Sequence, residues 1–290
     1  MRRKNFVCFV IAVLLVCSLG GTSVFAEENL FQAHLNENQT YTVTGGEIDS
    51  SSVEIPESLN DITVSRIETA AFLGNEKIRM VTIPQTIEEI GDWAFGNCTS
   101  LSFLEIENPD VRIGAAAFEN TLWLDKQAAG VVYIGNNAYT YKGEIPADTT
   151  LVLQSYITGI SDEAFAWQSH LETVEIPSGV VEIGDKAFYQ CENLTSVTIP
   201  ASVETIADDA FEGCSPDCTF YVERNSIAHM FVKDMGYHYS VPFAFTAAFW
   251  LSVGGGTVLL AAAIILVVIL RKKQKQKHEN PYEYVFYTKK

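Results

Sequence analysis

The sequence predicts a solenoid of stacked, similar coils, and three observations carry this prediction. The pair Ala-Phe recurs every 23 residues in two blocks, an apolar strand pattern follows most pairs at a constant distance, and proline often ends that pattern. The pairs are Ala71-Phe72, Ala94-Phe95, Ala117-Phe118, Ala164-Phe165, Ala187-Phe188 and Ala210-Phe211. A repeat of this length cannot bury its apolar face alone, so neighbouring repeats must stack to share a core.

Each repeat is expected to supply one strand whose side chains alternate between core and solvent. Leu194, Val197 and Ile199 have L-x-x-L-x-L spacing, which directs Val197 and Ile199 inward. Ser196 and Thr198 should then face outward. The equivalent apolar triplets are Ile78, Val81 and Ile83; Leu101, Leu104 and Ile106; and Leu171, Val174 and Ile176. Prolines cannot donate to a ladder and should end three strands, at Pro84, Pro177 and Pro200.

The regular spacing is interrupted between the two blocks. Residues 122–146 form an irregular unit, in which residues 131–141 are typical of a strand, a turn and a second strand. Ala138-Tyr139 is interpreted as the counterpart of the Ala-Phe pair. The aromatic side chains of this unit either fill a core that has lost its regular spacing, which we favour, or form a binding surface; they are Trp123, Tyr133, Tyr139 and Tyr141.

Both ends of a solenoid need a cap that covers the exposed apolar coil. Residues 27–49 are polar and should lead into a first strand that serves as the N-terminal cap. At the other end, residues 219–222 predict a last strand. Residues 226–235 predict a short helix, with Ser226 as its N-cap and Gly236 as its stop.

The repeat pattern resembles the BspA-like branch of leucine-rich repeats, whose unit reads roughly I-x-x-I-G-x-x-A-F-x-x-C-x-x-L-x-x-V-x-I-P. The resemblance covers residues 50–240, and six copies keep Ala-Phe at the same offset from the strand. It implies a leucine-rich repeat solenoid, a right-handed β/α coil with one parallel sheet and short helical turns around the Ala-Phe pairs. It also implies binding at a cell surface and no catalytic residues.

Two apolar segments outside the repeats predict an exported, membrane-anchored protein. Residues 1–26 have a basic start, an apolar stretch and small residues before Glu27, as in a signal peptide cut after Ala26. Residues 243–270 carry no charge. As a helix rising ~1.5 Å per residue they would exceed the ~30 Å of a bilayer core, so they predict a single transmembrane helix. The basic tail, 271–290, marks the cytoplasmic side and leaves the repeats extracellular.

The charge distribution argues against nucleic acid as a partner. The chain has a net charge of -17, and residues 27–242 contain 34 acidic and nine basic side chains. Such a surface repels phosphate backbones. The acidic excess favours a basic or cation-bridged partner, or it only keeps an exported solenoid soluble.

The cysteines are expected to be buried thiols and not a disulfide framework. Cys98, Cys191 and Cys214 each follow a repeat phenylalanine by three residues, where other repeats place Asn, Thr or Gln. That interchange favours an inward side chain that bonds to turn backbone. Oxidation among Cys191, Cys214 and Cys218 stays open, because these cysteines are close neighbours in an exported chain.

The sequence contains no pattern that indicates catalysis. None of the histidines belongs to a metal or nucleophile motif, so no catalytic residue, metal site or cofactor is predicted. The recurrent aspartates are interpreted as solvated turn residues; they include Asp92, Asp162, Asp185 and Asp208.

The predicted binding surface is the outward face of the strands. Its residues form two columns: Met80, Phe103, Thr173 and Ser196, and Thr82, Glu105, Glu175, Thr198 and Tyr221. Met80 and Phe103 are the candidate apolar anchors, although isolated apolar residues are also common on surfaces.

Two functional hypotheses follow from these observations. In the first, the protein is an adhesin or receptor that binds a protein or glycan on another cell or matrix. In the second, it is a structural or accessory envelope protein that assembles with membrane proteins of its own cell. The strand face does not choose between them, because solenoid surfaces specify partners through side chains that the fold leaves free.

Overall fold

The computed structural model of the 290-residue chain describes residues 30–147 and 149–241. The chain divides into two units, Met1–Pro242 and Phe243–Lys290, and all described residues belong to the first. The predicted signal peptide, transmembrane helix and tail lie outside the described residues. Within the described ranges, no helix has the length and apolar character that a membrane span requires.

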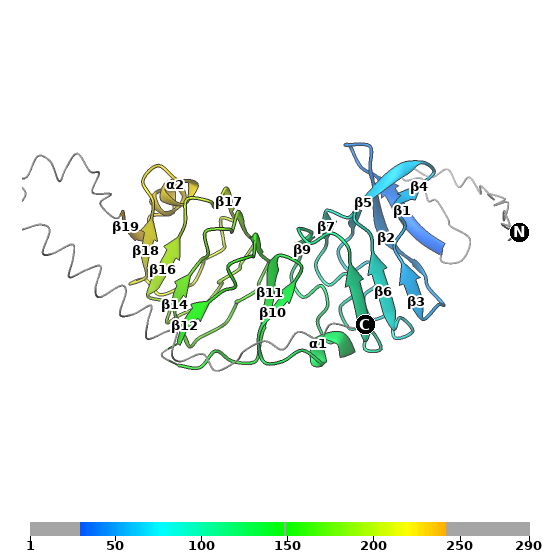
Figure 1. Ribbon diagram of the computed structural model, residues 1–290, viewed down its shortest axis with the longest axis horizontal. Helices are drawn as coiled ribbons and strands as arrows, with labels where there is room; N and C mark the ends of the chain where they lie inside the picture. The colour runs from blue at the N-terminus through cyan, green and yellow to red at the C-terminus, as the bar shows by residue number, and fades with distance from the viewer. Residues whose placement is uncertain (1–29, 148, 242–290) are drawn as a thin grey trace, which may run out of the picture. The chain divides into compact units, whose positions relative to one another are not determined.

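The described residues wind into successive coils, and most coils contribute one longer and one shorter strand (Figure 1). The longer strands form two parallel sheets. The first contains β3 (Ser52–Glu54), β6 (Met80–Ile83) and β8 (Phe103–Ile106). The second contains β12 (Thr149–Val152), β14 (Leu171–Glu175), β16 (Ser196–Ile199), β18 (Thr219–Val222) and β19 (His238–Ser240).

The remaining strands form two further ladders beside these sheets; we call them the shorter row because the regular coils contribute strands of only two residues to it, although the hairpin strands and the strand Ile62–Ile67 are longer. The first contains β1 (Leu30–Leu35), β2 (Tyr41–Glu47), β4 (Ser58–Leu59), β5 (Ile62–Ile67), β7 (Glu89–Ile90) and β9 (Arg112–Ile113). The second contains β10 (Gly130–Ile134), β11 (Asn137–Lys142), β13 (Gly159–Ile160), β15 (Glu182–Ile183) and β17 (Thr205–Ile206). Three pairs are antiparallel, namely β1–β2, β4–β5 and β10–β11.

The prediction of one parallel sheet is wrong, because both rows of strands break at the irregular unit. This unit forms helix α1 (Leu122–Asp125) and the predicted hairpin, β10–β11, and it adds no longer strand between β8 and β12. In the shorter row, β10 occupies one edge of β11 and β13 occupies the other. No edge of β11 is left for β9, so the ladder cannot continue across the unit.

Side-chain burial confirms the predicted alternation along the longer strands. Leu194, Val197 and Ile199 are buried, and so are the equivalent triplets that begin at Ile78 and Leu171. Leu104 and Ile106 are only half-buried. They lie on β8, which is the edge strand at the break, so no following coil covers them.

The repeat phenylalanines form two ring stacks inside the coils. Centroid distances between neighbouring rings are 5.0 Å for Phe72–Phe95, 5.6 Å for Phe95–Phe118, 5.3 Å for Phe165–Phe188 and 5.1 Å for Phe188–Phe211. Offset stacking of this kind adds to the free energy gained from apolar burial. The stacks lie in separate core clusters, one on each side of the break.

The Ala-Phe pairs lie in tight turns with hydrogen bonds between residues three apart, which agrees with the predicted short helical turns, and none of these turns extends into a helix. Residues on both sides of a pair adopt left-handed conformations, as at Ala70 (φ 58°) and Gly74 (φ 71°). In this turn the N–H of Ala71 bonds within its own coil, to Glu68 O at 3.2 Å, while the N–H of Phe72 donates to Ala94 O of the next coil at 2.8 Å. An α-helix would keep both bonds within one coil, so the turns allow coils to bond to each other.

All four cysteines of the described residues are free thiols; Cys98, Cys191 and Cys218 are buried as expected, whereas Cys214 is half-buried. Three donate from Sγ to a phenylalanine carbonyl of the preceding repeat: Cys98 to Phe72 at 3.1 Å, Cys191 to Phe165 at 3.2 Å and Cys214 to Phe188 at 3.1 Å. Burial raises the pKa of the Cys98 thiol to about 11.

Tyr139 of the irregular unit closes the first ring stack. Its ring meets Phe118 edge-on at 5.8 Å, and its hydroxyl accepts the Phe118 N–H at 2.9 Å. In regular coils an alanine carbonyl accepts that N–H. Ala138 pairs with Ile160 in the ladder, so the interpretation of Ala138-Tyr139 as a displaced Ala-Phe pair is wrong. The core-filling prediction is confirmed for Tyr139, which is buried, and for Trp123, which packs on Phe118 at 5.8 Å.

Aromatic residues also close the two outer ends of the stacks. Phe31 of hairpin β1–β2 meets Phe72 at 90°, and Phe220 of β18 meets Phe211 at 85°. The predicted C-terminal helix is confirmed as α2 (Ile227–Asp234). Its N-cap is Ser226, whose hydroxyl accepts the backbone N–H of His229 at 3.1 Å.

Replacement of Phe95 by alanine should lower the free energy of unfolding by about 3–5 kcal/mol, because it removes the central ring of a stack and leaves a cavity. Phe103→Ala is the matched control, since that ring is 48% exposed. This control should change the free energy of unfolding by less than about 0.5 kcal/mol. Urea unfolding measures both, and equal losses at the two positions would contradict the stacking argument.

Iodoacetamide at pH 8 should alkylate Cys98 in the native protein at least about 100-fold more slowly than in urea, because the buried thiol is inaccessible and resists ionisation. Peptide mass spectrometry of time points gives the two rates. Equally fast alkylation in the folded and unfolded protein would show that the thiol does not occupy the inward position.

Candidate functional site

The predicted binding residues lie at exposed or half-exposed positions on the longer strands. Met80 pairs with Phe103, and Thr82 with Glu105, on β6 and β8. The remaining residues follow the same register on β14, β16 and β18: Thr173 beside Ser196, and Glu175 beside Thr198 beside Tyr221. The structure therefore brings the predicted residues together as two separate groups, one on each side of the break.

The large apolar side chains of this face are well exposed. Met80 is 40% exposed, Phe103 48% and Tyr221 41%. Val152 on β12 is 65% exposed and pairs with Glu175, so it extends the second column. The sequence analysis missed Val152 because its coil lacks the L-x-x-L-x-L pattern.

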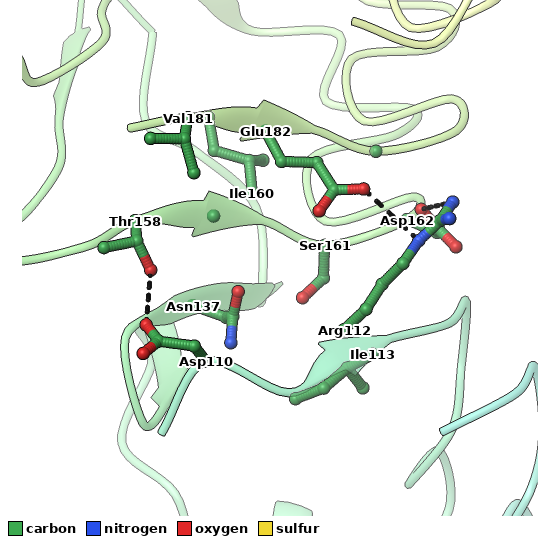
Figure 2. A pocket seen from close by; sticks show the side chains of 12 residues that line it. Asp110, Arg112, Ile113, Asn137, Thr158, Ile160, Ser161, Asp162, Val181 and Glu182 are labelled. Carbon is green, nitrogen blue, oxygen red and sulfur yellow. Dashed lines mark hydrogen bonds and ion pairs between the residues drawn. The ribbon is translucent and has the colours of Figure 1, made fainter. Parts of the chain in front are cut away.

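A second candidate site lies where the row of shorter strands breaks. It is a pocket of about 270 Å³, lined by residues of β9, β11, β13 and β15 and of the segments beside them (Figure 2). Gly159 stands between Asn137 and Glu182 in the ladder and has no side chain to fill this space. The sequence analysis did not predict this pocket.

Arg112 reaches across the pocket from β9 toward three carboxylates. Its guanidinium lies 3.6 Å from Asp162 Oδ1, 3.5 Å from Glu182 Oε1 and 3.7 Å from Asp185 Oδ2. These separations are longer than a normal N–H···O hydrogen bond. Arg112 is thus held by charge while its N–H groups keep room for another acceptor.

Asp162 differs from the solvated turn residue that the sequence analysis expected. Its side chain is only 12% exposed, and Oδ1 accepts the N–H of Asp185 at 2.8 Å. Asp92 makes the equivalent bond to the N–H of Ala115, also at 2.8 Å. Burial raises the pKa of Asp162 to about 6, although Arg112 and the Asp185 N–H favour its ionised form.

The opposite rim of the pocket is a hydrogen-bonded polar cluster. Asp110 Oδ1 accepts from the Asn136 side chain at 2.8 Å and from the Thr158 hydroxyl at 2.9 Å. The side-chain nitrogen of Asn137 donates to Val111 O at 2.9 Å. Within the described ranges, no group of three or more His, Cys, Asp or Glu residues has the arrangement of a metal site.

The family model for the BspA type leucine-rich repeat region, in six copies, matches residues 46–145 and 132–230 of the chain. No curated protein matches the chain.

The chain is also similar to solved leucine-rich repeat structures. The protein from T. pallidum is 24% identical, with 74% of this chain and 97% of that chain covered and a TM-score of 0.37. The protein from Bacteroides ovatus is 25% identical, with 68% and 54% covered and a TM-score of 0.37. A leucine rich cell surface protein from Faecalibacterium prausnitzii is 14% identical, with 82% and 99% covered and a TM-score of 0.29.

The raised pKa of Asp162 predicts a pH-dependent stability. Folding favours the protonated carboxyl, so this contribution is full below about pH 4 and is lost as the pH rises through about 6. Asp162→Asn stays uncharged and keeps the oxygen that accepts the Asp185 N–H. As the pH rises from 4 to 8, the free energy of unfolding of the variant should therefore increase by about 2–3 kcal/mol relative to that of the wild type. Urea unfolding at both pH values measures this difference, and a constant difference would contradict the assignment.

Proposed function

Because the chain belongs to the family of BspA-type leucine-rich repeat proteins, we propose that it is a cell-surface binding protein whose ligand docks on the outward faces of the longer strands. The ligand class is a protein or glycan of another cell or of the extracellular matrix. The proposal assigns no catalytic step, because the sequence has no recognisable nucleophile, base or metal motif. The repeats serve as a scaffold that carries a recognition surface.

The observation that carries this proposal is the exposed apolar pair on β6 and β8. Met80 and Phe103 are register partners on adjacent strands, and both side chains are well exposed. Thr82 and Glu105 stand beside them in the next outward column. Apolar anchors beside polar residues are the usual composition of a protein-binding patch.

The proposed location rests on the two apolar segments outside the repeats. A signal peptide at 1–26 would export the chain, and a membrane helix at 243–270 would retain it with the repeats outside. Export to the extracellular side is what a ligand on another cell or matrix requires. The alternative, an accessory protein of the same envelope, would share this topology and differ only in its partner.

A binding assay with residues 27–241 tests the function. The protein should bind saturably to immobilised extracellular matrix proteins or to intact foreign cells at physiological salt. The double variant with Met80→Ala and Phe103→Ala should lose about 30-fold or more in affinity, because it removes both anchors. Surface plasmon resonance against the immobilised matrix proteins gives the affinities.

The matched control for this assay is Leu73→Ala. Leu73 is 47% exposed but follows an Ala-Phe pair in a turn, away from the strand face, so its loss should leave binding unchanged. Equal binding by the double variant and the wild type would argue against the strand face. Binding only to an envelope extract of the source cell would favour the accessory role.

A further inference from the structure

Ser161 carries a side chain at a position where three other repeats have none. It follows the ladder residue Ile160, and the equivalent residues are Gly91, Gly114 and Gly184 in those three repeats and Glu68 and Ala207 in the first and last repeats. A Cβ at any of these glycines would collide with atoms of the preceding coil. The coil that precedes Ser161 differs from the regular coils, because β11 continues as a strand to Lys142 and does not turn after its ladder residue Ala138.

The Ser161 hydroxyl has no hydrogen-bond partner among the described residues. The residue is only 5% exposed, and its Oγ is buried from solvent. Figure 2 shows this oxygen pointing into the space between Asn137 and Arg112. An unpaired buried hydroxyl costs about 1–3 kcal/mol, so its position in the wall of a pocket indicates a bound polar group.

The groups around this hydroxyl offer both donors and acceptors. Ser161 and the guanidinium of Arg112 can donate. The carboxylates of Asp110 and Glu182 can accept, and Val181, which is 41% exposed, lines the same pocket with an apolar surface. A ligand with several hydroxyl groups and an apolar C–H face matches this mixture.

The charged side chains around the pocket restrict the class of ligand further. The carboxylates of Asp110, Asp162 and Glu182 surround a single arginine, so an anionic ligand would be repelled. A cationic ligand would be repelled by the Arg112 guanidinium, or would have to displace it from the carboxylates toward which it extends across the pocket. At about 270 Å³ the pocket lies just below the usual range for drug-sized ligands and suits one small ring.

We propose that the pocket between β9 and β15 binds one neutral sugar ring, with Ser161 and Arg112 as donors and Asp110 and Glu182 as acceptors for its hydroxyl groups. This site is separate from the strand face that carries Met80 and Phe103. It does not depend on the function proposed for that face. A terminal or branch residue of a glycan would present such a ring.

The test uses the full-length chain in a detergent without a sugar headgroup. The probes are the methyl glycosides of mannose, galactose and glucose, and saturation-transfer NMR with titration measures their binding. At least one probe should bind saturably with a Kd of about 1 mM, as expected for a ligand of this size. N-acetylneuraminic acid and Nα-acetyl-lysine amide are the anionic and cationic controls, and each should bind at least about tenfold more weakly.

Ser161→Ala separates this role from a structural one. The variant should bind the same glycoside about fivefold or more weakly, because one hydrogen bond is lost. Its urea midpoint should stay the same or rise, since the hydroxyl has no partner in the free protein. The matched control is Thr86→Val, which removes the other unpartnered buried hydroxyl of the described residues, outside the pocket. This variant should bind the sugar as the wild type does.

Three results would overturn the proposal. They are no saturable binding of any neutral glycoside up to ~50 mM, wild-type affinity in Ser161→Ala, and preferential binding of the lysine or sialic acid control. Binding to matrix proteins through Met80 and Phe103 would survive each of these results. Conversely, a wild-type protein that binds a glycoside but no matrix protein or foreign cell would reject only the function proposed for the strand face.

Discussion

The structure depends on one contact that every regular coil makes with the next. The repeat phenylalanine stacks its ring on the following ring and donates its backbone N–H to the following alanine carbonyl, as Phe165 does to Ala187 at 2.8 Å. Neither contact can form within one coil, so each end of a stack must be closed by something else. Aromatic side chains close three of the four ends: Phe31 meets Phe72, Tyr139 meets Phe118 and Phe220 meets Phe211, each edge-on.

This closing role explains why the irregular unit can interrupt the solenoid without leaving an exposed core. The Tyr139 hydroxyl accepts the Phe118 N–H that a missing alanine carbonyl would have accepted, and Ala138 packs in the other core cluster. The hairpin β10–β11 thus ends the first ring stack through Tyr139, and its strand β11 begins the ladder that continues with β13. The presence of this hairpin in place of a regular coil also divides the outward columns into two groups, and the pocket between β9 and β15 lies at the same place.

The sequence predicted the features that follow from periodic burial, and it failed where backbone conformation or pairing decides. Val197 and Ile199 were placed correctly because alternation along a strand is visible in the residues themselves. The turns at the Ala-Phe pairs were also predicted, but the left-handed conformation of residues such as Trp93 and Lys186 was not, because these residue types rarely adopt positive φ. The irregular unit at 122–146 was predicted, but the break in the sheets was not, since it depends on β10 occupying an edge of β11. One signal was available: Ser161 stands where three other repeats have glycine.

Regular and irregular coils are therefore suited to different ligands. In three of the repeats the packing of the preceding coil requires glycine after the ladder residue, at Gly91, Gly114 and Gly184, because a Cβ there would collide with that coil. Regular coils recognise partners through rows of outward side chains, which favours large, flat ligands. The pocket beside Ser161 lies where the preceding coil lacks the usual turn, because β11 continues as a strand to Lys142 after Ala138. The most irregular repeat of the chain is for this reason the place where a small ligand can be enclosed.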